Sequence, residues 1–267
     1  MISILIPSRN EPYLQKTIQD LRQKAIGDVE IIAVLDGYWP PIKEIETCPC
    51  VTYIHFSNPR GMRNAINSAV AIAKGDYILK VDAHVMFDKG YDVVLPEFCD
   101  DNVVVVPRRY ALDPVKWERT DNPKYPVDYM YLSNDYHGVI WEEKNKEPNI
   151  KVYDDLMSAQ GSCWFMHRDY YHELDLMDES LFGTFASEFQ EVGLKCWLSG
   201  GRVIVNKKTW YAHWHKEESR GYTLEKAEGQ KAVDHVKEWM NGKYTWPKQK
   251  YDIKWLVEHF APVPTWK

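Results

Sequence analysis

Residues 58–84 read N-P-R-G-M-R-N-A-I-N-S-A-V-A-I-A-K-G-D-Y-I-L-K-V-D-A-H. Small and apolar residues recur at helical spacing over residues 60–74, and Gly75 is suited to end that helix. An apolar strand over residues 76–82 follows and leads directly into Asp82 and His84. A helix that returns to a buried strand is the repeating unit of an open α/β sheet, so this stretch predicts that fold class.

The same alternation of strand and helix extends to both sides of this stretch. Further strands are predicted over residues 2–6, 30–35, 51–56 and 102–107. The first helix is expected to begin at Asn10, with Pro12 in its first turn, and to end at Gly27. Because the strands are continuously apolar, we expect them to be mostly parallel and covered by helices on both faces.

Periodicity weakens after the fifth strand. Residues 108–149 are irregular, charged and aromatic. Sheet-like order returns over residues 157–167, and a helix over 187–199 and a strand over 202–205 follow. Amphipathic helices are predicted around residues 224–240 and 251–260, so the chain should end in a helical extension.

Composition narrows the class of protein. The 267 residues allow one large domain with an appendage. The net charge of -6 argues against a general nucleic-acid binder, which normally carries a basic face. Five irregularly spaced cysteines indicate reduced thiols. Neither a signal peptide nor an apolar run of about 20 residues is found, so we expect a cytoplasmic protein with no membrane span.

Polar or turn-forming residues follow four of the predicted strands, at residues 7–11, 36–37, 58–61 and 82–84. In open α/β sheets, ligands bind in the crevice at the carboxyl ends of the strands. The four segments should therefore meet at one edge of the sheet and form the ligand site.

Asp82 and His84 are two residues apart in an extended segment, so their side chains project to the same side. A carboxylate oxygen with an imidazole nitrogen suits Mn²⁺ or a similar divalent ion. His213 and His215 repeat this spacing, and either can supply a further ligand. The alternative is a solvated turn in which Asp82 caps the backbone, with the histidines packed among aromatic side chains.

Two glutamates, Glu188 and Glu191, lie three residues apart in the first turn of a predicted helix and share one face. Acidic residues are favoured there by the helix dipole, which is a sufficient structural explanation. The functional interpretation is that one carboxylate acts as a base or orients a hydroxyl. Upstream, Gly161 permits close backbone approach to a ligand.

Taken in order, these motifs resemble those of nucleotide-sugar glycosyltransferases. P-S-R-N-E at residues 7–11 resembles the P-x-x-N-E opening of family-2 glycosyltransferases, and residues 58–84 resemble the stretch that ends in their acidic motif. V-D-A-H at 81–84 is similar to the L-D-S-H motif of polypeptide N-acetylgalactosaminyltransferases. The likeness continues at residues 159–174, 177–201 and 210–216, where W-Y-A-H-W-H-K resembles V-G-H-V-F-R.

The resemblance, which runs from about residue 2 to 216, implies a glycosyltransferase-A fold. This is a Rossmann-like α/β fold with a mostly parallel central sheet flanked by helices. It implies a catalytic domain over 1–216, with a nucleotide-binding half (1–107) and an acceptor and sugar half (108–216). Residues 217–267 would form a helical extension packed on it. Mn²⁺ or Mg²⁺ would be bound by Asp82, His84 and His213, because His213 falls on the family's histidine.

The resemblance also assigns donor-site residues. Pro7, Arg9 and Glu11 would border the nucleotide, and Asp36 would face its base. Arg63 would lie near the diphosphate or in the first turn of its helix, and Glu188 beside the donor sugar. The remaining donor-site residues that we predict are Gly61, Lys80, Gly161 and Trp164.

The expected activity is transfer of a sugar from a nucleoside-diphosphate sugar, with a UDP-sugar favoured, to an acceptor hydroxyl. The histidine-ended metal motif favours retention of configuration, while Glu188 or Glu191 as the base of an inverting reaction stays open. The enzyme would be a hexosyl- or N-acetylhexosaminyl-transferase. Its acceptor is open among a protein, a glycan or lipid-linked intermediate, a small molecule and a modified DNA base. F-A-S-E-F at residues 185–189 replaces the family's W-G-G-E-N around the sugar.

Two other classes of function remain. A sugar nucleotidyltransferase shares the α/β layout. Such enzymes carry a loop like G-x-G-T-R near the first strand, where this chain has P-S-R-N-E. A catalytically silent nucleotide-sugar-binding module would keep the fold without the reaction.

Overall fold

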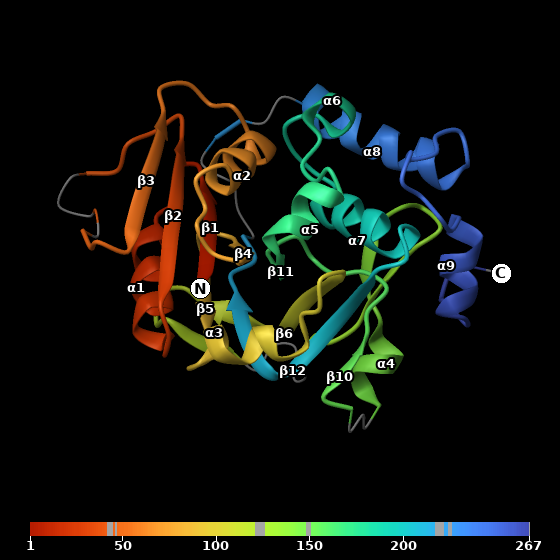
Figure 1. Cartoon of the computed structure of the whole chain (residues 1–267), viewed down its shortest axis with the longest axis horizontal. Helices are drawn as coiled ribbons and strands as arrows, with labels where there is room; N and C mark the ends of the chain where they lie inside the picture. Colours follow the sequence, from red (N-terminus) through yellow and green to blue (C-terminus); the bar gives the residue numbers. More distant parts are fainter. Residues whose placement is uncertain are drawn as a thin grey trace.

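The computed structural model describes residues 1–41, 45, 47–120, 126–147, 151–216, 222–223 and 226–266. Within this part of the chain, a central sheet of ten strands is covered by helices, which confirms the predicted α/β fold class (Figure 1). Its strands are, in spatial order, β10 (Tyr153–Asp155), β12 (Arg202–His213), β6 (Val103–Asp113), β11 (Cys163–His167), β4 (Tyr77–Val81), β1 (Ile2–Ser8), β2 (Val29–Asp36) and β3 (Val51–Phe56).

Most of this sheet is parallel. β3, β2, β1 and β4 pair in parallel, and β12 pairs in parallel with β6. Antiparallel β11 lies between β4 and β6, so both groups of strands run in the same direction. Two short strands leave this order: β5 (Val85–Phe87) pairs with β12, and β7 (Glu118–Thr120) pairs with β6. A separate hairpin joins β8 (Met130–Leu132) to β9 (Gly138–Ile140).

The strands separate two apolar cores, because side chains alternate between the faces of a strand. On β1, Leu5 packs into one core while Ile4 and Ile6 pack into the other. Helix α2 (Met62–Val70) contributes Ile66 to the first core, and helix α1 (Leu14–Lys24) contributes Ile18 to the second. The two helices therefore cover opposite faces of the sheet, as predicted.

The other helices of the described chain are short except for α7 and α8. They are α3 (Tyr91–Val94) followed by the 3₁₀ turn η2 (Leu95–Phe98), α4 (Glu142–Lys146), α5 (Arg168–Glu173), α6 (Glu179–Phe182), α7 (Glu188–Leu198), α8 (Lys226–Met240) and α9 (Ile253–His259).

Two predicted helix boundaries are wrong. Asn10 does not cap α1, which begins at Leu14 after Tyr13 and ends at Lys24, before Gly27. Asn10 instead adopts a positive φ of 53°, because the segment after β1 turns to carry Glu11 into the site. Helix α2 is shorter than residues 60–74: it begins at Met62, after residues 60 and 61 whose amides bind Asp36, and it ends at Val70 before a turn at residues 71–72.

The structure also finds more order than predicted in the second half of the chain. β6 continues to Asp113, and residues 118–146 include β7, β8, β9 and α4, where irregular structure was expected. β12 continues past an irregularity between Asn206 and Trp210 and stays paired with β6 as far as His213. Conversely, β11 begins only at Cys163, since residues 159–162 turn into a loop.

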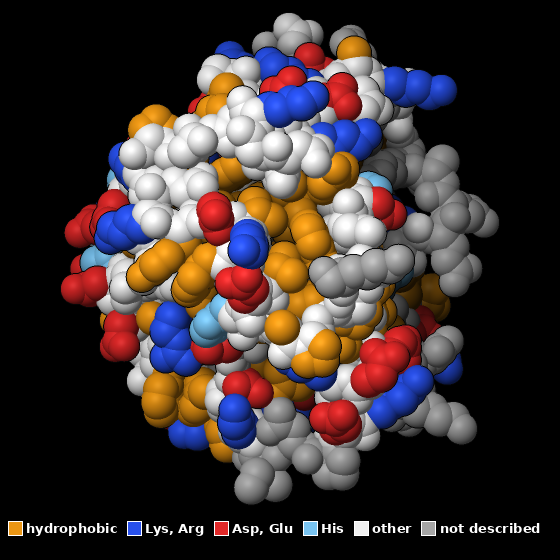
Figure 2. Space-filling model, turned by 90° about the vertical axis from the view of Figure 1, so that its right-hand side faces the viewer, with side chains coloured by type: hydrophobic (Ala, Val, Ile, Leu, Met, Phe, Trp, Pro, Cys, Tyr) orange, Lys and Arg blue, Asp and Glu red, His pale blue; other side chains and the backbone are white. Residues whose placement is uncertain are grey.

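The C-terminal extension packs on the sheet domain through aromatic side chains. Trp239 of α8 and Phe260, just after α9, belong to the same apolar core as Trp197 of α7. Figure 2 shows the face that carries this extension, where hydrophobic side chains gather among charged ones. No helix of the described ranges is both long and apolar enough to cross a membrane.

We expect Trp239→Ala to destabilise the protein by about 3–5 kcal/mol, because it empties a buried indole site. Trp239 is 1% exposed, and its Nε1 donates a hydrogen bond to Gln249 Oε1 at 2.8 Å. Urea unfolding measures the change. Trp39, at 51% exposure, provides the matched control, and Trp39→Ala should have little effect. Equal small effects of the two changes would show that the extension does not share the core.

Candidate active site

A cavity of about 940 Å³ opens at the carboxyl ends of β1, β2 and β4 and at the end of β12. Its lining includes most of the residues that the sequence assigns to the site: Pro7, Arg9, Glu11, Asp36, Gly61, Asp82, His84, Gly161, Glu188 and His213. Four other predicted site residues do not line it: Arg63, Lys80, Trp164 and Glu191.

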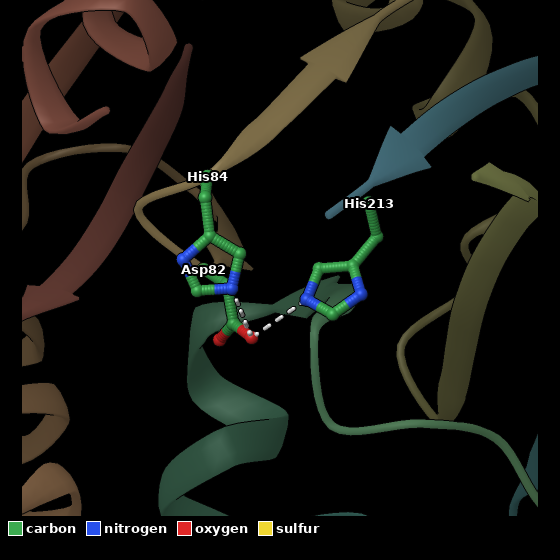
Figure 3. Close-up of side chains that lie close together, drawn as sticks. All are labelled: Asp82, His84 and His213. Carbon is green, nitrogen blue, oxygen red and sulfur yellow. Dashed lines mark hydrogen bonds and ion pairs between the residues drawn. The ribbon is translucent and has the colours of Figure 1, made fainter. Parts of the chain in front are cut away.

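Asp82, His84 and His213 converge on one point of the cavity wall (Figure 3). Asp82 follows β4, His84 precedes β5, and the pairing of β5 with β12 sets Val85 opposite His213. Asp82 Oδ2 lies 3.2 Å from His213 Nε2 and 3.7 Å from His84 Nε2. One candidate ligand atom from each residue lies within 4.8 Å of the others, so the three side chains can share one ion.

Glu11 orients the His84 ring from behind. Its Oε2 lies 3.0 Å from His84 Nδ1, and its other oxygen pairs with Lys216. A carboxylate on one ring nitrogen holds the proton there and leaves the other nitrogen as a ligand, which is typical of metal-binding histidines. Burial would raise the pKa of Glu11, but His84 and Lys216 together lower it below its usual value.

The ionisation states suit a cation. Burial lowers the pKa of His213 to about 3 despite the nearby Asp82, so the ring is neutral at pH 7, as ligation requires. Burial would raise the pKa of Asp82, but the Lys80 ammonium and the His213 hydrogen bond hold it well below its usual range. His213 Nδ1 is buried and has no partner among the described residues, so no second group fixes this ring as Glu11 fixes His84.

Lys80 lies beneath the cavity and not in it. Its ammonium donates to Asp82 Oδ1 at 2.8 Å, to Glu188 Oε2 at 2.9 Å and to the Gly161 carbonyl at 2.6 Å. Burial would lower the pKa of Lys80, but the carboxylates of Asp82 and Glu188 raise it above its usual value. Lys80 is thus a buried cation that joins the candidate metal site to Glu188, and direct contact with a donor is not its role in this geometry.

Of the two glutamates predicted to be catalytic, only Glu188 lines the cavity. Its Oε1 accepts the indole N–H of Trp164 at 2.7 Å, and its Oε2 accepts Lys80. A Cβ added at Gly161 would lie 2.9 Å from Glu188 Oε2. The close approach predicted at Gly161 is therefore to this carboxylate. Trp164, which is fully buried, supports Glu188 from below.

Glu191, in the same turn of α7, is fully buried and does not line the cavity. It pairs with Arg63 at 3.1 Å and Lys195 at 2.9 Å, and it accepts the backbone N–H of Asp178. Arg63 also donates to the Ala186 carbonyl at 2.8 Å. Both residues fix the segment before α7, and neither faces the cavity. This placement leaves Glu188 as the carboxylate that can contact a ligand.

Asp36 organises the loop before α2. Its two oxygens accept the amides of Arg60 at 2.5 Å and Gly61 at 3.1 Å. Gly61 has a φ of 92°, and a Cβ there would lie 2.5 Å from Thr184, so only glycine fits. Asp36 still lines the cavity, but its carboxylate already serves the backbone.

Sequence reasoning did not single out three residues that shape the site. Lys216 pairs with Glu11, Gln160 lines the cavity, and Arg109 contacts Gln160 from the inner side. A lysine inside the apolar run Y-I-L-K-V was a visible signal for the role of Lys80, because a charge in a buried strand requires partners. No comparable local signal marks Arg109.

We expect Lys80→Met to destabilise the metal-free protein by about 3–5 kcal/mol, because it leaves Asp82 and Glu188 without their buried counter-ion. Adding Glu188→Gln should recover part of this loss, since one unpaired charge is removed. A double-mutant cycle by urea unfolding measures the coupling. Lys208→Met, at an exposed pair with Glu97, is the control and should not change the midpoint. Additive effects of the two site changes would contradict the contact.

Ser187→Gly should stabilise the protein by about 1 kcal/mol. Ser187 precedes α7 with a φ of 51° and makes no side-chain capping bond, and this left-handed backbone favours glycine. Ser68→Gly in the middle of α2 is the matched control and should destabilise by about 0.5 kcal/mol. Thermal unfolding compares them, and equal losses of stability would show that Ser187 is not strained.

A family model described as "Glycosyl transferase family 2" matches residues 3–175. The crystal structure of GalNAc-T7 with UDP, GalNAc and Mn²⁺ matches with a TM-score of 0.74 at 16% identity, covering 98% of this chain and 56% of that one. Staphylococcus aureus TarS matches with a TM-score of 0.53 at 15% identity, covering 80% and 36%.

These structural matches show the fold alone, because the identities are low. The chain spans about half the length of the GalNAc-T7 chain. A search of curated proteins found no match.

Proposed function

The chain belongs to glycosyl transferase family 2 and is a glycosyltransferase; on that premise, we propose that it uses a nucleoside-diphosphate sugar, a UDP-sugar in preference to others, and a divalent cation. The observation that carries the proposal is the convergence of Asp82, His84 and His213 on the wall of a cavity of about 940 Å³. That volume is at the upper end of small-molecule sites, so it suits a nucleotide sugar together with part of an acceptor.

The donor set fits Mn²⁺ or Mg²⁺. One carboxylate oxygen and two imidazole nitrogens are ligands that Mn²⁺ accepts, and Mg²⁺ would favour the oxygen. Asp82, His84 and His213 would hold the ion, with Glu11 orienting His84. A bound divalent ion would neutralise the diphosphate and stabilise it as a leaving group. The Mn²⁺ and UDP present with GalNAc-T7, which shares the fold, support this choice.

The cavity has a nucleotide end and an acceptor end. Pro7, Arg9 and Asp36 lie at the nucleotide end, where the Arg9 guanidinium stands 4.5 Å from the centre of the Tyr222 ring. We name as the acceptor end the lining residues from the second half of the chain: Met130, Gly138, Gln160, His215 and Gln190. We propose that the halves 1–107 and 108–216 of the catalytic domain correspond to these two ends, with 217–267 as an extension.

Glu188 would orient the donor sugar. Both of its oxygens already accept a strong donor, from Trp164 and from Lys80, and each oxygen has a further lone pair for a sugar hydroxyl. Burial raises the pKa of Glu188 although Lys80 lowers it, but Trp164 and Lys80 already occupy both oxygens, so this carboxylate is better placed to orient a hydroxyl than to remove its proton. Because Glu191 does not reach the cavity, neither glutamate favours the role of base, and retention of configuration is the outcome we propose.

The proposed acceptor is of one of the classes named from the sequence: a protein, a glycan or lipid-linked intermediate, a small molecule or a modified DNA base. A cytoplasmic location likewise stays a prediction from cysteine usage. The family assignment weighs against a sugar nucleotidyltransferase. A silent binding module differs from the enzyme only in lacking turnover, so donor hydrolysis separates the two.

A donor screen tests the proposal. UDP-, GDP-, CMP- and dTDP-sugars are compared with and without Mn²⁺, by thermal shift and by slow hydrolysis of the donor. We expect a UDP-sugar with Mn²⁺ to stabilise the protein by about 2.7 kcal/mol at 100 times its Kd. Asp82→Asn and His84→Ala should remove the Mn²⁺-dependent part, whereas Asp113→Asn, away from the cavity, should keep it. Unchanged Mn²⁺-dependent UDP binding in the first two variants would refute the metal site.

A further inference from the structure

Arg109 is a buried cation at the acceptor end of the cavity. It lies on β6 opposite Tyr211 of β12, and its side chain is 6% exposed. Its Nη1 donates to Gln160 Oε1 and lies 3.4 Å from His215 Nε2, while Nη2 lies 3.8 Å from Met130 Sδ. All three contacted side chains line the cavity, so the guanidinium stands directly behind its wall.

None of these contacts supplies a negative charge. Four cationic side chains are buried in the described chain: Arg63, Lys80, Arg109 and Lys195. Arg63 and Lys195 pair with Glu191, and Lys80 pairs with two carboxylates. For Arg109, no carboxylate of the described residues lies within ion-pair distance. A buried charge without a counter-ion is costly, so this guanidinium differs from the others in a way that packing does not explain.

Gln160 lies between Arg109 and the cavity and offers a hydrogen-bond donor of its own. Its Oε1 accepts from Arg109 and, at 3.2 Å, from the hydroxyl of Ser162. Because Oε1 accepts both hydrogen bonds, the other amide atom, Nε2, is a donor, and it makes no hydrogen bond with another described residue. An amide donor on the cavity wall, with a guanidinium directly behind it, supplies the groups that bind phosphate or carboxylate oxygens.

We propose that Arg109 and Gln160 form an oxyanion subsite, and that the acceptor carries a phosphate or carboxylate group near the hydroxyl that receives the sugar. The proposal rests on the proposed function and narrows its acceptor class. Asp82, His84 and His213 provide for the diphosphate of the donor, whereas Arg109 lies beyond His215 at the acceptor end. The subsite therefore adds to the donor site and does not duplicate it.

Inorganic phosphate is the probe, because it carries the shared chemistry without a defined acceptor. The thermal unfolding midpoint is followed while phosphate replaces chloride at constant ionic strength, with and without saturating UDP and Mg²⁺. Wild type is compared with Arg109→Met and with Arg108→Met. The neighbouring Arg108 is the matched control, because Asp128 binds it through two hydrogen bonds of 2.8 and 2.7 Å away from the lining.

We expect phosphate to raise the midpoint of the wild type saturably, and to do so also when UDP and Mg²⁺ are present. Arg109→Met should need at least tenfold more phosphate for half of the effect, with a change in UDP affinity of less than twofold. Arg108→Met should respond to phosphate as the wild type does. If Arg109→Met does not fold, Gln160→Leu replaces it and should weaken the phosphate response severalfold.

Three results would overturn the subsite. In the first, phosphate does not change the unfolding midpoint of the wild type. In the second, the variant at Arg109 or Gln160 responds to phosphate as the wild type does. In the third, saturating UDP abolishes the phosphate response and Arg109→Met weakens UDP binding, so that Arg109 serves the donor diphosphate. Failure of UDP to bind at all would refute the proposed function instead, and the phosphate series without nucleotide would still decide the subsite.

Discussion

The buried ammonium of Lys80 holds together the two parts of the site that lie far apart in the sequence. It binds Asp82 at the end of β4 and Glu188 at the start of α7. Lys80 is paired across the sheet with Trp164 of β11, so the two donors that hold Glu188 come from one cross-strand pair. The position of the cavity carboxylate thus depends on the register between β4 and β11. A slip of one residue between the two strands would move one of the donors to the opposite face and separate the pair.

The candidate metal site depends on a second long-range pairing. His213 reaches Asp82 only because β12 continues past its irregular middle and stays paired with β6 and β5. Charges around the site are unbalanced: Glu11, Asp82 and Glu188 bring three negative charges, and Lys80 and Lys216 bring two positive charges. A cation is therefore favoured beside Asp82, whereas the uncompensated charge of Arg109 at the acceptor end favours an anion. The candidate metal site and the Arg109 region thus favour ions of opposite sign.

Local sequence patterns were sufficient for the strands of the first half of the chain and for the residues at their ends. Continuous apolar runs located β1 to β4, and the spacing of Asp82 and His84 placed their side chains on one side. The resemblance of motifs identified His213, which lies next to Asp82 in the structure although it is far from it in the sequence. The patterns failed where tertiary contacts decide: Asn10 turns because Glu11 must meet His84, and Glu188 and Glu191, equivalent by spacing, are separated by their ion partners. A buried ion network cannot be read from spacing, because its members come from different elements.

The segment before α7 keeps the backbone path of the fold while the side chains that line the cavity change. Ala186 and Ser187 have positive φ angles of 73° and 51°, at positions where the resembling enzymes have two glycines. The backbone path is thus the one that glycine favours, although this chain carries side chains there and bears the strain. Those side chains, with Phe185 and Phe189, line the cavity beside Glu188. This part of the cavity is therefore filled differently from the W-G-G-E-N motif of the resembling enzymes, so the GalNAc found with GalNAc-T7 does not indicate which sugar would bind here.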